Sequence, residues 1–93
     1  MNVYTTKFMG ITVHSTARKA VESVQYGTFN SSVCEWCNDT QGWTTTEKGR
    51  QIDMENKTEA DIKWLIAELN KEGFITFDLG GCDSETVEKH RII

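Results

Sequence analysis

Two cysteines three positions apart form the only motif in the sequence with a recognised chemical spacing. Cys34 and Cys37 stand in the run Cys-Glu-Trp-Cys, and two thiolates at this spacing can chelate a metal ion or cycle between dithiol and disulfide. A zinc site needs two further ligands, for which the sequence offers Cys82 with His90 or with His14. The zinc set that the sequence suggests is therefore Cys34, Cys37, Cys82 and His90.

Two other interpretations of the cysteine pair compete with zinc. Redox catalysis of the thioredoxin type relies on a cis-proline facing the cysteines, and this chain contains no proline. In the remaining interpretation, Cys34 is a small buried residue on a strand and Cys37 lies in the loop after it. We favour burial, so the sequence predicts no bound metal and no cofactor, and the zinc set is kept as the alternative.

Catalytic motifs are absent from the sequence. His14 and His90 have no partner in the sequence suited to general-base catalysis. Gly80-Gly81 lacks the further glycines and the Lys-Ser/Thr pair of a phosphate-binding loop, and no serine nucleophile motif occurs. We therefore predict that the protein is not an enzyme.

Trp64 is the residue that most suggests a binding surface. Apolar residues at helical spacing predict a helix over residues 58–72, capped by Thr58 and closed by Gly73. Its buried stripe consists of Ile62, Leu65, Ile66 and Leu69. At about 100° per residue, Trp64 lies about 160–200° from that stripe and should face away from the core. Exposed tryptophan beside small residues is typical of an interface centre.

The predicted partner-binding surface comprises Trp64, Ala60, Ala67, Asp61, Glu68 and Lys71. The alternative is that the C-terminal tail folds over Trp64, with Ile92 and Ile93 as cover.

Charge is distributed unevenly along the chain. Residues 1–46 hold three acidic and three basic residues, whereas residues 47–93 hold eleven and seven, so the whole net charge of −4 lies in the second half. A field of this sign repels phosphate and favours a protein partner with a basic surface, whereas on most acidic domains it serves only solubility. Tyr4 and Phe8 could stack on bases from an open sheet face, but the scattered Lys and Arg residues argue against nucleic acid as a partner.

Strands and helices are expected to alternate along the chain. A short helix should begin at Ser15 or Thr16 and end before Gly27. Strands are expected over residues 3–13, with Gly10 as a bulge, and over residues 28–36, 43–46 and 74–79. Residues 43–54 form either one strand or a hairpin around Lys48-Gly49, and residues 83–93 form either a short helix or an edge strand.

This element order predicts an α+β fold of the ferredoxin-like βαββαβ type, an antiparallel sheet with two helices on one face. The length of 93 residues predicts a single domain over residues 1–93. No window approaches the roughly 18 apolar residues of a membrane helix, and residues 1–7 lack the form of a signal peptide. Three cysteines are too few for a disulfide scaffold, so we expect a cytoplasmic protein that does not bind membranes. The sequence leaves the oligomeric state open.

These observations predict a small interaction or regulatory protein that works by surface recognition. It would be an inhibitor or adaptor, of the kind common among phage accessory and anti-host proteins, that occupies a basic groove of a larger protein with its acidic surface. One alternative is a zinc-stabilised module that contacts nucleic acid. The other is a small-molecule-binding regulatory domain of the ferredoxin-like type.

Overall fold

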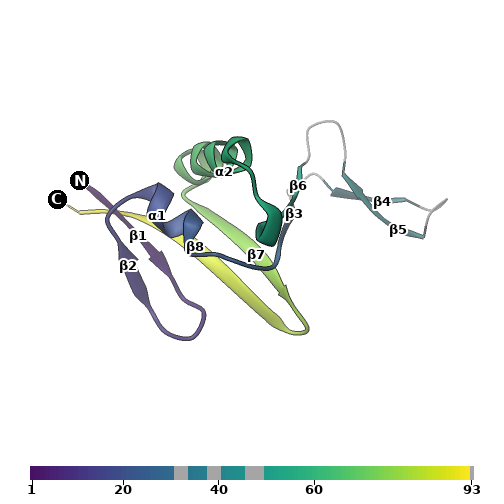
Figure 1. The fold of residues 1–93 in the computed structure, drawn as a ribbon, viewed down its shortest axis with the longest axis horizontal. Helices are drawn as coiled ribbons and strands as arrows, with labels where there is room; N and C mark the ends of the chain where they lie inside the picture. Colours follow the sequence, from purple (N-terminus) through teal and green to yellow (C-terminus); the bar gives the residue numbers. More distant parts are fainter. Residues whose placement is uncertain (31–33, 38–40, 46–49, 93) are drawn as a thin grey trace.

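The computed structural model describes residues 1–30, 34–37, 41–45 and 50–92, and for residues 30, 34–37 and 42–45 it describes the backbone alone. Within these residues, six antiparallel strands form a large sheet in the order β2-β1-β8-β7-β3-β6 (Figure 1). They are β1 (Asn2–Thr6), β2 (Thr12–His14), β3 (Thr28–Asn30), β6 (Gln51–Asp53), β7 (Phe74–Gly80) and β8 (Asp83–Arg91). Two further strands, β4 (Cys34–Cys37) and β5 (Gly42–Thr45), pair with each other beyond the β3–β6 end of the large sheet.

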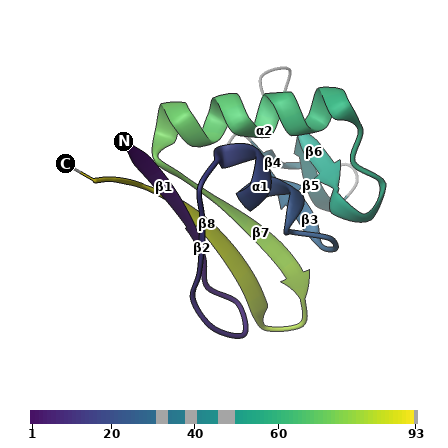
Figure 2. The ribbon, with the colours of Figure 1, turned by 60° about the vertical axis from the view of Figure 1, so that its left-hand side comes forward.

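Two helices, α1 (Ala17–Glu22) and α2 (Glu59–Glu72), pack on one face of the large sheet, and a short 3-10 helix η1 (Met54–Asn56) precedes α2 (Figure 2). Alternate strand residues point toward the helices, as the two-residue period of a strand requires. The buried apolar residues of the strands are Tyr4, Phe29, Ile52, Ile75, Phe77 and Val87, and the buried helix residues include Ala20, Val21, Leu65 and Leu69. The core therefore lies between the helices and one face of the sheet, and the other face is open.

Helix α2 confirms the element predicted for residues 58–72. The Thr58 hydroxyl accepts a hydrogen bond from the Asp61 amide at 3.2 Å, and the Asp61 carboxylate accepts one from the Thr58 amide at 2.9 Å. This reciprocal capping box satisfies two amides that the first turn leaves unpaired. Gly73 follows the helix with a φ of 87°, and its amide donates to the Leu69 carbonyl. Of the predicted stripe, Ile62, Leu65 and Leu69 are buried and Ile66 is partly buried.

The strand predicted over residues 3–13 is instead a hairpin of β1 and β2. Met9 and Gly10 have φ values of 63° and 117°, and the Gly10 amide donates to the Lys7 carbonyl at 3.2 Å. Two consecutive residues with positive φ reverse the chain in a tight turn. Gly10 therefore forms a turn and not the bulge expected from the sequence.

The C-terminal segment is a long central strand, neither a helix nor an edge strand. Gly80 and Gly81 have φ values of 95° and 59°, which lets the chain turn back directly from β7 into β8. β8 then pairs with β7 on one side and with β1 on the other, with Asn2 opposite Arg91. The last strand thus links the N-terminal hairpin to the rest of the sheet.

The ferredoxin-like prediction is wrong. The structure is more β-rich than βαββαβ, because the first predicted strand is a hairpin and a further strand occupies residues 83–91. Residues 28–36 contribute to two strands in different sheets, β3 and β4, and residues 43–54 likewise divide into β5 and β6. Lys48 and Gly49 lie outside the described residues. The antiparallel sheet with helices on one face is retained, with one long helix and one short one.

Candidate functional site

Two residues of the suggested zinc set, Cys82 and His90, lie at opposite ends of β8. Cys82 is an exposed free thiol in the turn before β8. From Asp83 to His90 an extended strand spans roughly 23 Å, at about 3.3 Å per residue. One zinc ion cannot bind both Cys82 and His90 across this distance, because bonds between zinc and its ligands are about 2.0–2.3 Å long. The structure describes only the backbone of Cys34 and Cys37. Among the side chains that it describes, no group of three or more metal-binding residues occurs.

His14, the alternative zinc ligand, is engaged within the β1–β2 hairpin. Its Nε2 atom lies 3.0 Å from the Thr6 hydroxyl, at hydrogen-bond distance. Thr6 is buried and lies on the helix-facing side of β1, so this contact joins the two strands of the hairpin. The ring is therefore placed to stabilise the hairpin.

Trp64 packs against the core, contrary to the expectation that it faces away. Its ring meets the Phe29 ring edge to face, with centroids 5.5 Å apart and an angle of 62° between the planes. The Arg50 guanidinium lies 5.3 Å from the Trp64 ring centroid, within cation–π range. Trp64 is thus half-buried between β3 and Arg50. Of the two tail residues expected to cover Trp64, Ile92 is itself 47% exposed and Ile93 lies outside the described residues.

The other residues of the predicted α2 surface divide into exposed and engaged side chains. Ala60, Ala67 and Lys71 are exposed, and Glu68 is half-buried. Asp61 is engaged, because its carboxylate accepts hydrogen bonds from the Thr58 amide and from Arg50 at 2.8 Å. The hydrogen bond from the Thr58 amide has the largest effect and the hydrogen bond from Arg50 the next. Both hold the pKa of Asp61 below its ordinary value.

Ion pairs reduce the free negative charge at the start of α2. Arg18 of α1 donates two hydrogen bonds to the Glu59 carboxylate, at 2.8 and 2.5 Å. These bonds lower the pKa of Glu59 and raise that of Arg18. Because Glu59 and Asp61 both have cationic partners, the α2 surface offers less free negative charge to a partner than the sequence count suggests.

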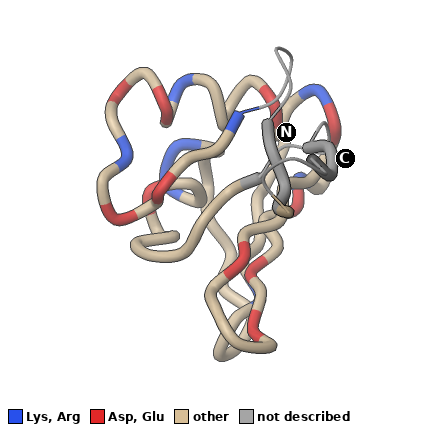
Figure 3. The backbone as a smooth tube through the Cα atoms, turned by 90° about the vertical axis from the view of Figure 1, so that its right-hand side faces the viewer, with Lys and Arg blue, Asp and Glu red and all other residues tan. Residues whose placement is uncertain are grey.

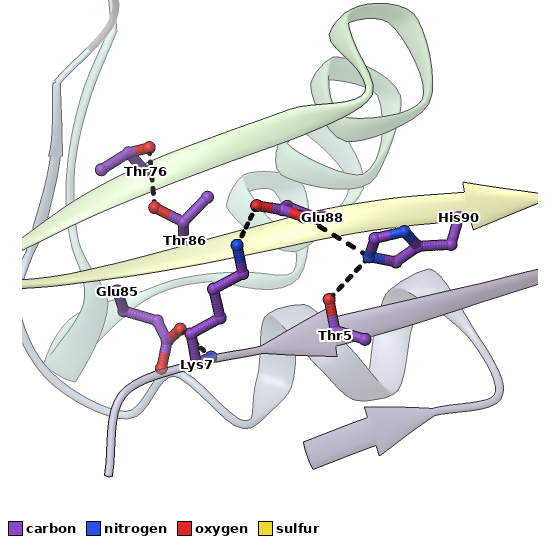
Figure 4. A network of polar contacts seen from close by, with 7 residues as sticks. All are labelled: Thr5, Lys7, Thr76, Glu85, Thr86, Glu88 and His90. Atoms are coloured by element: carbon purple, nitrogen blue, oxygen red, sulfur yellow. Dashed lines mark hydrogen bonds and ion pairs between the residues drawn. The ribbon is translucent and has the colours of Figure 1, made fainter. Parts of the chain in front are cut away.

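The open face of the large sheet carries a polar network (Figure 4). The Lys7 ammonium pairs with Glu88 and, by its hydrogen bond, lowers the pKa of that carboxyl group. His90 Nε2 lies 3.4 Å from the other Glu88 oxygen and 2.9 Å from the Thr5 hydroxyl. These side chains come from β8 and from β1 and the residue after it, so the network joins two strands that are distant in sequence.

The two aromatic residues considered for base stacking do not lie on that open face. Tyr4 is buried on the helix side, and its hydroxyl donates to the Asn70 side chain of α2 at 3.3 Å. Phe8 is half-buried and lines a hollow near the β1–β2 turn. The open face thus lacks the stacking platform that these two residues would have formed.

Exposed apolar side chains gather on the β1–β2 hairpin. Met9 is 89% exposed, Ile11 is 76% exposed and Val13 is 64% exposed. β2 is the outermost strand of the sheet at this side, and residues 8–14 contain no charged side chain. Exposed edge strands usually carry Lys, Pro or a bulge that discourages pairing with another chain. This edge is apolar and uncharged, which is typical of a contact surface.

The β1–β2 turn (residues 7–11) and the β7–β8 turn (residues 81–82) lie at the same end of the large sheet, which we call the hairpin end (Figures 1 and 2). Acidic positions predominate on the strands that reach the bottom of the view in Figure 3, where these turns lie. Near the β7–β8 turn they include Asp78, Asp83 and Glu85. The hairpin end therefore combines apolar and acidic side chains.

A hollow of about 250 Å³ opens beside the β1–β2 turn. Its lining includes Phe8, Tyr26, Leu79 and Glu85. Glu85 is only 7% exposed, and its two oxygens accept hydrogen bonds from the Lys7 and Phe8 amides at 2.6 and 3.0 Å. Glu85 thus holds the turn through its carboxylate and is one of the residues that line the hollow.

The chain matches no known protein family, curated protein or solved structure. The site is therefore interpreted from its geometry. Of the helices among the described residues, none has the length and apolar character needed to cross a membrane.

Sequence reasoning missed the hairpin end. Met9, Ile11 and Val13 are apolar residues of one parity in the predicted strand, but parity does not say which face of the sheet is covered. Glu85 counts in the sequence only as one acid among eleven in the second half. The signal that could have located the turn was Gly10, three residues after Lys7 and flanked by β-type segments.

The Trp64→Ala variant is expected to lose about 2 kcal/mol of unfolding free energy, because the ring packs against Phe29 and supports Arg50. Urea denaturation followed by far-UV circular dichroism measures the loss. Lys71→Ala, at an exposed α2 position, is the matched control and should change stability by less than about 0.5 kcal/mol. Equal stability of the two variants would contradict the packing described for Trp64.

Proposed function

We propose that this chain is a small, non-enzymatic protein-binding module that contacts its partner through the hairpin end. The observation that carries the proposal is the exposure of Met9, Ile11 and Val13 on an uncharged edge strand and its turn. Burying these side chains against a partner would remove apolar surface from water, at about 25 cal/mol per Å². A single exposed apolar residue needs no explanation, but three on one short hairpin are the best candidate contact surface among the described residues.

The acidic character of the hairpin end supports a partner with a basic surface. Asp83 and Asp78 lie near the β7–β8 turn, on β8, which is the strand next to the apolar hairpin, and on β7 beyond it. Charges around an apolar centre add orientation and association rate more than affinity. The partner we propose therefore presents apolar residues beside basic ones, and the module acts on it as an inhibitor or adaptor. The exposed thiol of Cys82 is compatible with a cytoplasmic location, which we include in the proposal.

The proposal moves the working surface from α2 to the hairpin end. Trp64 is half-buried beneath Arg50, so it offers less apolar area than an interface centre on α2 would need. Ala60 and Ala67 are exposed but small. In this proposal, any contact between α2 and the partner lies outside the main interface, which the hairpin end forms.

Replacing Ile11 and Val13 by Thr tests the proposal. Both changes keep the branched side chain that suits a strand and remove apolar surface. In affinity capture from a lysate of the organism that encodes the chain, with quantitative mass spectrometry, we expect at least a tenfold lower recovery of the partner.

Phe74→Thr is the matched control, since Phe74 is 55% exposed and lies at the opposite end of β7 from its turn. It should retain the partner at the level of the unmodified chain. Unchanged recovery with the double variant, or loss of the partner with Phe74→Thr alone, would refute a contact at the hairpin end.

A further inference from the structure

The hollow at the hairpin end is lined by a buried acid that has no cationic partner among the described side chains. Glu85 is more than nine-tenths buried, yet in the described part of the chain only the Lys7 and Phe8 amides bond to its carboxylate. The Lys7 ammonium lies with Glu88, which faces the other side of the sheet. Buried carboxylates are usually paired with a cation or fully hydrogen-bonded.

The Glu85 carboxylate retains capacity for a further donor. An ionised carboxylate offers about four acceptor positions on its two oxygens. Each oxygen accepts one hydrogen bond, from the Lys7 amide at 2.6 Å and from the Phe8 amide at 3.0 Å. The second position on each oxygen is then available to a donor that enters the hollow.

The remaining walls of the hollow suit an organic cation. Phe8 and Tyr26 line it, and aromatic rings attract ammonium and guanidinium groups through their π faces. Thr12, His14 and Gln25 also line it and add polar groups. A volume of about 250 Å³ is below the range of about 300–1,000 Å³ typical of drug-sized ligands. The size matches the end of one long side chain better than a whole metabolite.

We propose that the hollow binds the cationic end of a single Lys or Arg side chain of the protein partner. Glu85 accepts hydrogen bonds from the ammonium or guanidinium group, and Phe8 and Tyr26 contact its flanks. This inference rests on the proposed function, because it identifies the residue class that the same site recognises. The apolar hairpin residues then bind the partner's apolar side chains, and the hollow selects a neighbouring basic one.

The small cations n-butylguanidinium and n-butylammonium test the hollow without the partner. Titrated into ¹⁵N-labelled protein, they should produce saturable shifts of the Lys7, Phe8 and Tyr26 amide signals that weaken as salt is added. The neutral analogue n-butylacetamide should produce no saturable shift. Absence of saturable binding by both cations, or equal binding of the neutral analogue, would overturn the proposal.

Three variants localise the binding. Glu85→Gln should weaken cation binding at least tenfold, whereas Glu88→Gln, which removes the same charge from the opposite face of β8, should leave it unchanged. Because Glu85→Gln also weakens a turn, Gln25→Trp provides a second test: it fills the hollow from an exposed loop position and should block binding. Cation binding that survives Gln25→Trp, or that is lost equally in Glu88→Gln, would show that the cation binds elsewhere.

The proposed function and the inference about the hollow can each be refuted without the other. The Ile11→Thr and Val13→Thr double variant should bind the small cations like the unmodified chain, since neither residue lines the hollow. If the cations bind but the double variant still captures the partner, the proposed function is wrong, whereas cation binding in the hollow is supported. If the double variant loses the partner but no cation binds, the inference about the hollow is wrong alone.

Discussion

The Phe77→Ala variant is expected to lose about 3–5 kcal/mol of unfolding free energy. Phe77 is fully buried in the middle of β7, and its ring centroid lies 5.7 Å from that of Phe29. Truncation removes the apolar contact area and leaves a cavity that the rigid sheet and α2 cannot fill. Domains of this size have total stabilities of about 5–15 kcal/mol, so the variant should unfold at markedly lower denaturant concentration.

Phe74→Ala on the same strand separates burial from residue type. Phe74 is 55% exposed and points to the open face, so its truncation should cost less than about 1 kcal/mol. Urea denaturation followed by far-UV circular dichroism gives both free energies under identical conditions. Similar losses in the two variants would mean that the helix-facing side of β7 is not the core of the protein.

The elements that sequence reasoning predicted correctly have strong local signals. Thr58, the apolar stripe and Gly73 define α2 within a single stretch of chain, and the adjacent run of β-type residues defines β7. Each of these signals depends on side chains that act within a few residues of one another. Such elements form in almost any tertiary context, which is why their boundaries agree with the structure.

The C-terminal strand, which sequence reasoning missed, depends in part on long-range pairing. Asp83 and Ser84 have good helix-capping side chains, yet residues 83–88 pair with β7 and residues 88–91 pair with β1 from the other end of the chain. Glu85 and Val87 lie opposite Phe77 and Ile75 of β7 and are buried on the same face, although one is charged and the other apolar. Local composition cannot reveal a strand whose alternation is set by distant partners.

The position of Trp64 follows from the width of the sheet. A helical wheel assigns one stripe to the core, which suits a helix on a narrow sheet. Here β3 lies beneath the flank of α2, so Phe29 meets Trp64 outside the predicted stripe. The candidate site escaped prediction for a related reason, because the exposure of Ile11 and Val13 depends on β2 being the outermost strand.

Gly27, which the sequence predicts as the cap of the first helix, instead brings two strands together. α1 ends at Glu22 with Ser23 as its cap, and Gly27 lies in the segment that leads into β3. A Cβ atom at position 27 would lie 2.6 Å from the Asp78 carbonyl oxygen and 2.8 Å from Leu79 Cδ2. The close approach of this backbone to β7 is possible only without a side chain.

The Gly27→Ala variant should therefore be destabilised by two effects, while Gly73→Ala experiences only one. Both glycines have positive φ, 97° and 87°, which costs an alanine about 1–2 kcal/mol. A Cβ atom added at position 73 would point into open space, whereas one at position 27 meets the β7 backbone, which should add about 1–3 kcal/mol. Urea denaturation of the two variants measures the difference. A loss at Gly27 no larger than that at Gly73 would mean that β7 yields easily there, and that the β3–β7 pairing does not depend on the missing side chain.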